Sequence, residues 1–262
     1  MQHLLLDTTA GVTTVTLNRP DVRNAFNDEL IAELSAVVLE LGRRPEVRCI
    51  VLAGSGPAFC AGADLNWMRS VAGYTREQNL EDAAGLARML EVLYRCPKPT
   101  VARVHGDTYA GGTGLVAACD IAVSVDTAHY CLSEVRLGLI PATISPYVLR
   151  AMGARAAHRF FLTAERFSAA EAHRIGLVHE VVAADQLDAR MHDITASLVS
   201  AGPEAVKACK QLLHDVAGQE ITAGLVRRTV EGIADIRTSD EGREGIRSFL
   251  DKRKPAWVLP PA

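Results

Sequence analysis

Two glycine-rich segments are the part of this sequence best suited to catalysis. Residues 59–65 read Phe-Cys-Ala-Gly-Ala-Asp-Leu, and residues 109–115 read Tyr-Ala-Gly-Gly-Thr-Gly-Leu. Each follows a short apolar stretch and leads into a predicted helix. Backbone N–H groups at a helix start lack intrahelical acceptors and lie at the positive end of the helix dipole, so they can bind an oxyanion. Two such segments indicate an oxyanion hole, although glycines also serve simply to permit tight turns.

Other familiar catalytic motifs do not occur in the sequence. Gly54-Ser55-Gly56 supplies two glycines of a dinucleotide-binding fingerprint, but Phe59 stands where the third belongs. There is no phosphate-binding Gly-Lys-Ser/Thr, no paired-histidine zinc motif and no Gly-x-Ser-x-Gly elbow. The eight histidines are scattered and the six cysteines form no close pair, so we expect no metal site and free, buried thiols. Among the histidines, only His105, which ends a predicted strand, is a candidate for a functional role.

The composition is that of a globular protein that folds without disulfides or metals. Of 262 residues, 48% are hydrophobic and 23% are charged, which fits neither disorder nor a coiled coil. The net charge of −3 offers no large positive field, so general binding to nucleic acid or anionic lipid is not expected. The sequence contains no basic leader and no run of eighteen apolar residues. We therefore expect no membrane segment and a reducing, cytoplasmic location.

Alternating strands and helices are predicted to carry the glycine-rich segments. Apolar patterns and turn residues predict helices at 28–41, capped by Asp28, and at 77–94, and strands at 3–7, 12–17, 48–53, 100–104, 121–125 and 129–132. This order predicts an α/β core. After residue 141 one strand is predicted at 177–182 and helical patterns dominate, at 145–152, 154–162, 168–174, 187–199, 203–216, 219–236 and 240–252. These helices cover the core or pack against another subunit, and residues 259–262 are expected to be a frayed end.

Six spaced motifs resemble the crotonase, or enoyl-CoA hydratase/isomerase, family in the family's order. They are Asn18-Arg19-Pro20 with Asn24-Ala25-Phe26, residues 59–65, Ala118-Cys119-Asp120, and residues 132–141, 175–178 and 244–253. The resemblance implies an α/β fold of ββα turns wound into a short superhelix over residues 1–195. It also implies a C-terminal helical region over residues 196–262 that builds homotrimers, commonly paired into hexamers.

The resemblance also implies which residues act on an acyl-CoA thioester. The N–H groups of Ala63 and Gly111 would hold the thioester carbonyl oxygen as it gains enolate charge. Glu134 would be the acid/base, its pKa raised by an apolar acyl pocket. Coenzyme A would be bound by Arg23, Ala25, Ala61, Asp64, Leu65 and Asn66, with Phe249 and Lys252 reaching the substrate of a neighbouring subunit. Because coenzyme A is part of the substrate, no separate cofactor is implied.

Gly114 departs from the family pattern, because a two-glutamate hydratase carries its first glutamate at this position. Either Glu134 combines the roles of both carboxylates, or another group replaces the missing one, or the chain avoids water addition. Asp107, Tyr109 and Glu81 are the candidate replacements.

Three functions remain open from the sequence. The first, which we favour, is hydration of a 2-enoyl-CoA with a branched acyl chain. Residues 64–68, 111–119 and 139–147 resemble bacterial methylglutaconyl-CoA and isohexenylglutaconyl-CoA hydratases of leucine and terpene breakdown. The second is a Δ3,Δ2-enoyl-CoA isomerase, which needs one carboxylate and the same oxyanion hole. The third is a non-catalytic acyl-CoA-binding member of the family, against which Glu134 argues.

Overall fold

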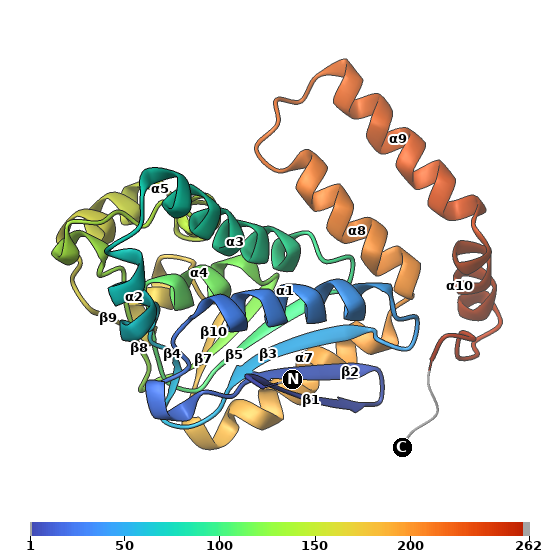
Figure 1. The fold of residues 1–262 in the computed structure, drawn as a ribbon. Coiled ribbons are helices and arrows are strands. Elements are labelled where there is room, and N and C mark those ends of the chain that lie inside the picture. Colours follow the sequence, from blue (N-terminus) through green and yellow to red (C-terminus); the bar gives the residue numbers. More distant parts are fainter. Residues whose placement is uncertain (1, 259–262) are drawn as a thin grey trace.

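Two sheets flanked by helices form the body of the molecule (Figure 1). The computed structural model describes residues 2–258, so the expected frayed end at residues 259–262 lies outside the described residues. Apart from an antiparallel hairpin of its first two strands, the larger sheet is parallel. Its strand order is β1 (Leu4–Thr9), β2 (Val12–Leu17), β3 (Cys49–Gly54), β5 (Thr100–Val104), β7 (Ile121–Val125) and β10 (Glu180–Val182).

The chain passes repeatedly from the larger sheet into a smaller one and then into helices. The smaller sheet has the order β4 (Ala58–Cys60), β6 (Asp107–Tyr109), β8 (His129–Cys131) and β9 (Phe167–Ser168). The strand pairs β3–β4, β5–β6 and β7–β8 are followed respectively by α2 (Leu65–Val71) with α3 (Arg76–Tyr94), by α4 (Gly111–Ala118) and by α5 (Ser145–Thr163). This repeated ββα turn confirms the fold that the family resemblance implied.

Helix α1 (Asp28–Arg43) shows how the sequence pattern sets the packing. Its buried residues lie on one helical face: Leu30, Ile31, Leu34, Val37, Val38 and Leu41. The helix begins at Asp28, but Asn27 caps it, because its Oδ1 accepts a hydrogen bond from the N–H of Leu30 at 3.0 Å. The prediction that Asp28 is the cap is therefore wrong by one residue. In β3, five successive residues are buried, as expected for a parallel strand that is covered on both faces.

The sequence patterns do not predict β4, β6 or β9. Each strand has two or three residues, too few to show an alternating pattern, and each forms only by pairing with a strand far along the chain. The helices predicted at 145–152 and 154–162 form one kinked helix, α5, in which Gly153 has a positive φ of 74°. Because Gly153 has non-helical dihedral angles, with ψ of 158°, the break predicted between the two helices is confirmed.

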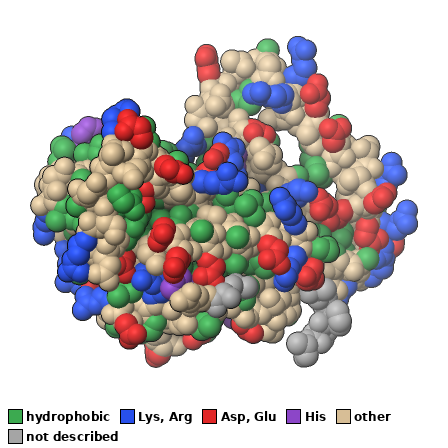
Figure 2. All heavy atoms as spheres, viewed as in Figure 1, with side chains coloured by type: hydrophobic (Ala, Val, Ile, Leu, Met, Phe, Trp, Pro, Cys, Tyr) green, Lys and Arg blue, Asp and Glu red, His purple; other side chains and the backbone are tan. Residues whose placement is uncertain are grey.

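The C-terminal helices project from the body (Figure 1). After α6 (Ala169–Arg174) and α7 (Leu187–Ser200), the chain forms α8 (Pro203–Val216), α9 (Ala223–Thr238) and α10 (Asp240–Leu250), which with residues 251–258 we call the C-terminal arm. The predicted boundary between residues 195 and 196 falls inside α7 and stays a prediction. Exposed apolar side chains of the arm are Leu212, Leu213, Ile221, Val226, Val230, Ile233, Ile246, Phe249 and Leu250. Figure 2 shows basic and acidic side chains interspersed with hydrophobic ones on this region.

Two further expectations concern buried, free cysteines and the absence of a membrane-spanning helix. All six cysteines are free, and five are buried as expected. The expectation of buried thiols is wrong for Cys209, because Lys210 is the buried residue of α8 and Cys209 stays exposed. Within residues 2–258, no helix is both long enough and apolar enough to cross a membrane.

A buried ion pair connects the arm to the body. Lys210 is 8% exposed, and its Nζ lies 2.6 Å from Asp120 Oδ2 and 3.2 Å from the carbonyl oxygen of Lys98. The same Asp120 oxygen accepts hydrogen bonds from the N–H and the hydroxyl of Thr100, at 2.8 and 2.9 Å. Asp120, the last residue of one family-like motif, is thus a structural anchor between β5, β7 and the arm.

We expect Asp120→Asn to lower the free energy of unfolding by about 2 kcal/mol, because it leaves the buried Lys210 cation without a counter-charge. Urea denaturation followed by circular dichroism measures the change. The matched control is Lys207→Gln, one turn earlier on α8, where the ion pair with Glu204 is exposed and spans 3.3 Å. This control should change stability by less than about 0.5 kcal/mol. Equal effects in the two variants would contradict the anchoring role.

Candidate active site

The predicted catalytic residues lie at one edge of the smaller sheet. β4, β6 and β8 are parallel neighbours, and Tyr109 of β6 is opposite Cys131 of β8. The segments that leave these three strands carry Ala63, Gly111 and Glu134. Because the carboxyl ends of parallel strands share an edge, and ligands of α/β sheets bind at that edge, these residues meet where a substrate is expected.

The N–H groups of Ala63 and Gly111 have the geometry of unused donors. Phe26 forms a parallel bridge with Ala63, in which the N–H of Phe26 donates to Gly62 O at 2.6 Å and the N–H of Asp64 donates to Phe26 O at 2.8 Å. Since these flanking groups face Phe26, the N–H of Ala63 points the other way. Gly111 is the first residue of α4, where an N–H has no intrahelical acceptor. Within residues 2–258, neither N–H donates to a protein acceptor.

Glycines allow the two donor segments to touch. Gly62 has a φ of 88°, and a Cβ on it would lie 3.0 Å from Ala110 Cβ and 3.2 Å from Tyr109 O. A Cβ on Gly112 would lie 2.6 Å from Cys60 O. Ala110 has a φ of 49°, a left-handed value that is uncommon for alanine and that here turns the chain from β6 into α4. The close contact and the strained turn both hold the donors in place.

Glu134 brings a buried carboxyl group to the same edge. It begins the 3-10 turn η2 (Glu134–Leu137), three residues after the end of β8. Its Oε2 is buried and has no hydrogen-bond partner among the described residues. Burial raises the pKa of Glu134, and only the hydrogen bond from its own backbone N–H acts to lower it. An unpaired carboxyl group that holds a proton more tightly than usual is suited to general acid and base catalysis.

The place of the family's other glutamate is filled by apolar packing. Gly114 lies three residues after Gly111 on α4, hence close to the same helical face, and is buried. A Cβ on Gly114 would lie 2.2 Å from Cγ2 and 2.8 Å from Cβ of Ile144. The position therefore has no room for any side chain while Ile144 keeps its place.

The candidate replacements for the missing carboxylate are held elsewhere. Asp107 accepts hydrogen bonds from the hydroxyl of Tyr109 at 3.0 Å and from the N–H of His129 at 3.0 Å, and it pairs with Arg166 at 2.9 Å. Burial and the bond to Asp107 raise the pKa of Tyr109, which keeps its proton on that bond. Glu81 lines a groove between α1 and α3. Their role as replacements stays a prediction.

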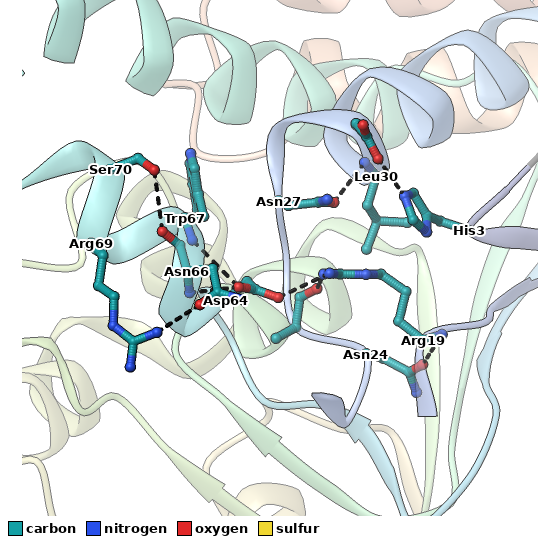
Figure 3. Close-up of polar contacts among 12 residues, drawn as sticks. His3, Arg19, Asn24, Asn27, Leu30, Asp64, Asn66, Trp67, Arg69 and Ser70 are labelled. Carbon is teal, nitrogen blue, oxygen red and sulfur yellow. Dashed lines mark hydrogen bonds and ion pairs between the residues drawn. The ribbon is translucent and has the colours of Figure 1, made fainter. Parts of the chain in front are cut away.

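Arg19 and Asn24 support the donor segment from behind (Figure 3). The guanidinium of Arg19 pairs with Asp64 at 2.9 Å and donates to the carbonyl oxygen of Ala25. The buried side-chain amide of Asn24 reaches three carbonyl groups, at 2.8, 2.9 and 3.1 Å, those of Ser55, Ala58 and Phe59. Sequence reasoning quoted both residues in a motif without assigning them a role. The signal that could have identified them is the polar motif itself, in a stretch where the sequence predicts no strand or helix and the structure has only the short 3-10 turn η1 (Pro20–Val22).

Asp64 holds the start of α2. Its Oδ1 accepts hydrogen bonds from the N–H groups of Asn66 at 2.7 Å and Trp67 at 3.3 Å (Figure 3). Burial raises the pKa of Asp64, but these bonds and the one from Arg19 outweigh that effect and hold the pKa below its ordinary value. The Asp64 side chain is therefore used inside the protein, and its predicted contact with coenzyme A stays a prediction.

The other residues predicted to bind coenzyme A surround this segment. The N–H of Ala61 donates to Arg23 O at 2.9 Å, so a contact between the Ala61 backbone and adenine would use its carbonyl group. The side chains of Arg23, Leu65 and Asn66 are exposed, whereas Ala25 is buried. These predicted residues lie on two segments, 23–26 and 61–66, that hydrogen-bond to each other through their backbones.

Phe249 and Lys252 lie far from the rest of the predicted site. Both are exposed, Phe249 at 83%, and they belong to α10 and the turn after it. Figure 1 shows α10 and α2 at opposite sides of the molecule. In one chain these residues cannot contact the same ligand as Asn66, and their predicted role at a neighbouring subunit stays a prediction.

Neither His105 nor a metal-binding cluster of the described residues lies at this edge. His105 precedes β6, at the opposite end of that strand from Gly111, and its Nε2 bonds Gly56 O at 2.9 Å. Burial lowers its pKa, and its Nδ1 has no partner among the described residues. Within residues 2–258, no three side chains of His, Cys, Asp or Glu converge as they do around a metal ion.

Comparison with known proteins identifies the family. The family model described as "Enoyl-CoA hydratase/isomerase" matches residues 7–259. The chain belongs to this family. An enoyl-CoA hydratase from Shewanella pealeana has a crystal structure that superposes with a TM-score of 0.95 at 42% identity, over 98% of this chain and 96% of that one. AtuE of Pseudomonas aeruginosa superposes with a TM-score of 0.94 at 36% identity, over 98% and 100% of the two chains. The mevalonyl-coenzyme A hydratase sidH of Aspergillus fumigatus is 33% identical over 95% of this chain and 92% of its own.

We expect Ala63→Pro to lower kcat by about 100-fold or more, because it removes one backbone donor that this family-like oxyanion hole would use. The N–H of Ala63 has no acceptor in the part of the chain that the structure describes, and the bridge to Phe26 uses its neighbours, so the fold should persist. Steady-state kinetics with an enoyl-CoA measures the loss, and circular dichroism checks folding. Ala63→Ser keeps the N–H and should retain activity. Full activity in the folded proline variant would remove Ala63 from the mechanism.

Proposed function

We propose that this family member is an enoyl-CoA hydratase that adds water across the 2,3 double bond of an acyl-CoA thioester, with Glu134 as its acid/base. The observation that carries this proposal is the carboxyl group of Glu134, whose pKa is raised and whose buried Oε2 has no partner among the described residues. It lies at the edge that also carries two N–H donors without a protein acceptor in residues 2–258. A buried carboxyl oxygen with no protein partner among the described residues is available to contact a substrate or a water molecule at this edge.

In the proposed reaction the thioester oxygen accepts hydrogen bonds from the N–H groups of Ala63 and Gly111. The ionised Glu134 takes a proton from water while the water oxygen bonds to C3 and the π electrons move to form an enolate. The two N–H groups stabilise the enolate oxygen because they are already oriented toward it. Glu134 then returns the proton to C2, which restores the carboxylate and completes the addition of one water molecule.

A branched acyl chain is the proposed substrate class, with 3-methylglutaconyl-CoA as one example. Support comes from the name of one relative, a mevalonyl-coenzyme A hydratase, since mevalonyl-CoA carries a branch at C3. The resemblance of residues 64–68, 111–119 and 139–147 to methylglutaconyl-CoA hydratases supports the same class. Coenzyme A arrives as part of this substrate, next to the exposed residues Arg23 and Asn66, and the reaction requires no separate cofactor.

Δ3,Δ2-Enoyl-CoA isomerisation is the second candidate, and the packing of Ile144 on Gly114 favours it. That packing leaves no room for a carboxylate at position 114. Glu134 then provides the carboxylate at this edge, and its Oε2 has no protein partner among the described residues. An isomerase needs no more than that. Glu134 would remove a proton from C2 of a 3-enoyl-CoA to give a dienolate held by the same N–H groups. It would then return the proton to C4, with no water consumed.

We propose further that the protein is a homotrimer built through the C-terminal arm, with hexamers formed by pairing of trimers. The arm exposes many apolar side chains, among them Ile233, Ile246 and Leu250, and such a surface is typical of an interface between subunits. In this assembly Phe249 and Lys252 would reach the coenzyme A of a neighbour.

We expect Glu134→Gln to lower kcat by about 1,000-fold, because the amide cannot carry the proton. A coupled absorbance and mass-spectrometric assay with 2-enoyl-, 3-enoyl- and 3-methylglutaconyl-CoA measures it. A gain of one water that the variant loses supports the hydratase, and isomerisation without a mass change supports the second candidate. An acyl-CoA bound tightly without turnover would support a non-catalytic binder, and full activity in the variant would exclude both enzymes.

The raised pKa of Glu134 sets the pH dependence of activity and stability. Wild-type kcat/KM should fall as pH drops through this pKa, which lies above the ordinary value of 4.5, because the base becomes protonated. Burial disfavours the charged form, so the carboxylate lowers stability above the raised pKa and not below the ordinary value. Glu134→Gln should therefore increase the free energy of unfolding at pH 7 by about 1 kcal/mol, and this gain should vanish below pH 4. Urea denaturation at several pH values tests the sign.

We expect Phe249→Asp to convert trimers into monomers, because it places a carboxylate in the proposed apolar interface. Light scattering after size-exclusion chromatography measures the mass. Leu5→Asp is the matched control, since Leu5 on β1 is also exposed, at 54%, but lies outside the arm. A wild-type monomer, or dissociation by both variants alike, would contradict the arm as the interface.

A further inference from the structure

The side chain of Ile144 packs against Gly114 on the side where a Cβ of residue 114 would stand. Ile144 is 2% exposed and caps the start of α5, where its carbonyl oxygen accepts hydrogen bonds from the N–H groups of Tyr147 and Val148, both at 3.1 Å. These bonds fix its backbone at the helix end. A Cβ on Gly114 would lie 2.2 Å from its Cγ2, a distance that real Cβ atoms do not show. The backbones of residues 114 and 144 cannot shift easily, because Gly114 lies inside α4 and Ile144 caps α5.

The contact makes residues 114 and 144 a coupled pair. A side chain at 114 requires the removal of the side chain at 144, and the Cβ of Ile144 itself would still lie 2.8 Å from a new Cβ. Reduction of Ile144 to alanine therefore does not make enough room, whereas glycine does. Glycine is also well tolerated at a helix cap, so position 144 can accept it without loss of the helix start.

We propose that Ile144 is the residue that restricts this active site to a single carboxylate, and so determines that one group, not two, handles the protons of the reaction. Its branched side chain occupies the volume of a carboxylate on α4 and keeps that side of Gly114 apolar. Water at C3 then has Glu134 alone as its base. The inference rests on the proposed function for its chemical meaning, but its packing part stands on the contact between Ile144 and Gly114.

The chemical consequence follows from the number of carboxylates. With one carboxylate, the same group must remove a proton and return it. This suits the transfer of a proton between two carbons, or an addition in which Glu134 takes a proton from water and then gives it to C2. With two, the groups interact, so that one stays protonated while the other is ionised. The ionised one then takes a proton from water as the C3–O bond forms, the protonated one gives its proton to C2, and exchange with solvent restores both.

Thermal unfolding tests the packing part without any substrate. Gly114→Ala should lower the melting temperature by about 5 °C, because the new Cβ overlaps Ile144. The double variant Gly114→Ala/Ile144→Gly should melt higher than the sum of the two single changes predicts, which a double-mutant cycle with Ile144→Gly detects. A Gly114→Ala protein as stable as wild type, or additive effects, would overturn the proposal.

Kinetics tests the chemical part with a second carboxylate. Gly114→Glu/Ile144→Gly should hydrate unbranched crotonyl-CoA about tenfold faster than Ile144→Gly, because a second base then acts on water. The matched control is Gly114→Gln/Ile144→Gly, which has the same shape and should show no gain. A gain in both variants, or in neither of two well-folded proteins, would overturn the role of Ile144 in limiting the site to one carboxylate.

The two parts separate this proposal from the proposed function. Inactivity of the wild-type chain on every enoyl-CoA would count against the proposed function alone, because coupling in the melting temperatures would still support the packing of Ile144. Hydration by the wild-type chain together with additive melting temperatures would overturn the inference and leave the proposed function standing.

Discussion

The active-site edge depends on the parallel pairing of β4, β6 and β8. Adjacent strands lie about 4.8 Å apart, so three successive carboxyl ends place their outgoing segments within about 10 Å of each other. Glycines then allow the first two segments to touch, as Gly62 does against Ala110. The pairings are short, with two residue pairs between β6 and β8, and so the larger sheet must hold each strand in register from the preceding turn. The superhelix is thus the condition under which residues far apart in sequence form one site.

Much of the family-like sequence pattern serves this scaffold and not the chemistry directly. Arg19 and Asn24 hold the segment around Ala63 through carbonyl and carboxylate contacts, and Asp120 holds the C-terminal arm through Lys210. A motif of this kind therefore reports the contacts that orient backbone groups. Ile144 adds a converse case, in which an apolar side chain outside any polar motif sets the shape of the site.

The sequence predicts the larger sheet and most helices well because their apolar patterns are long enough to read. It fails for β4, β6 and β9, whose two or three residues form strands only through distant partners, and for Asn27, whose cap differs by one residue from the expected Asp28. The glycine-rich pattern predicted the donor segments and the family resemblance predicted Glu134, and the structure places all of them at one edge, while their catalytic roles stay predictions. The ion pair of Asp64 with Arg19, the support by Asn24 and the overlap at Gly114 could not be found, because each depends on a contact across more than thirty residues or on the volume of a neighbour.

The unused donors of this site are main-chain groups, and that has an evolutionary consequence. Substitution at residue 63 or 111 alters a side chain but, proline apart, leaves the amide in place. The capacity to polarise a thioester, which the proposed function assigns to these amides, is thus preserved through most point mutations. A side-chain group such as Glu134, the proposed acid/base, can be lost or replaced by a single substitution. A lineage with this architecture can evolve new reactions through changes at a few residues that line the site, without first losing the amides proposed to bind the thioester carbonyl.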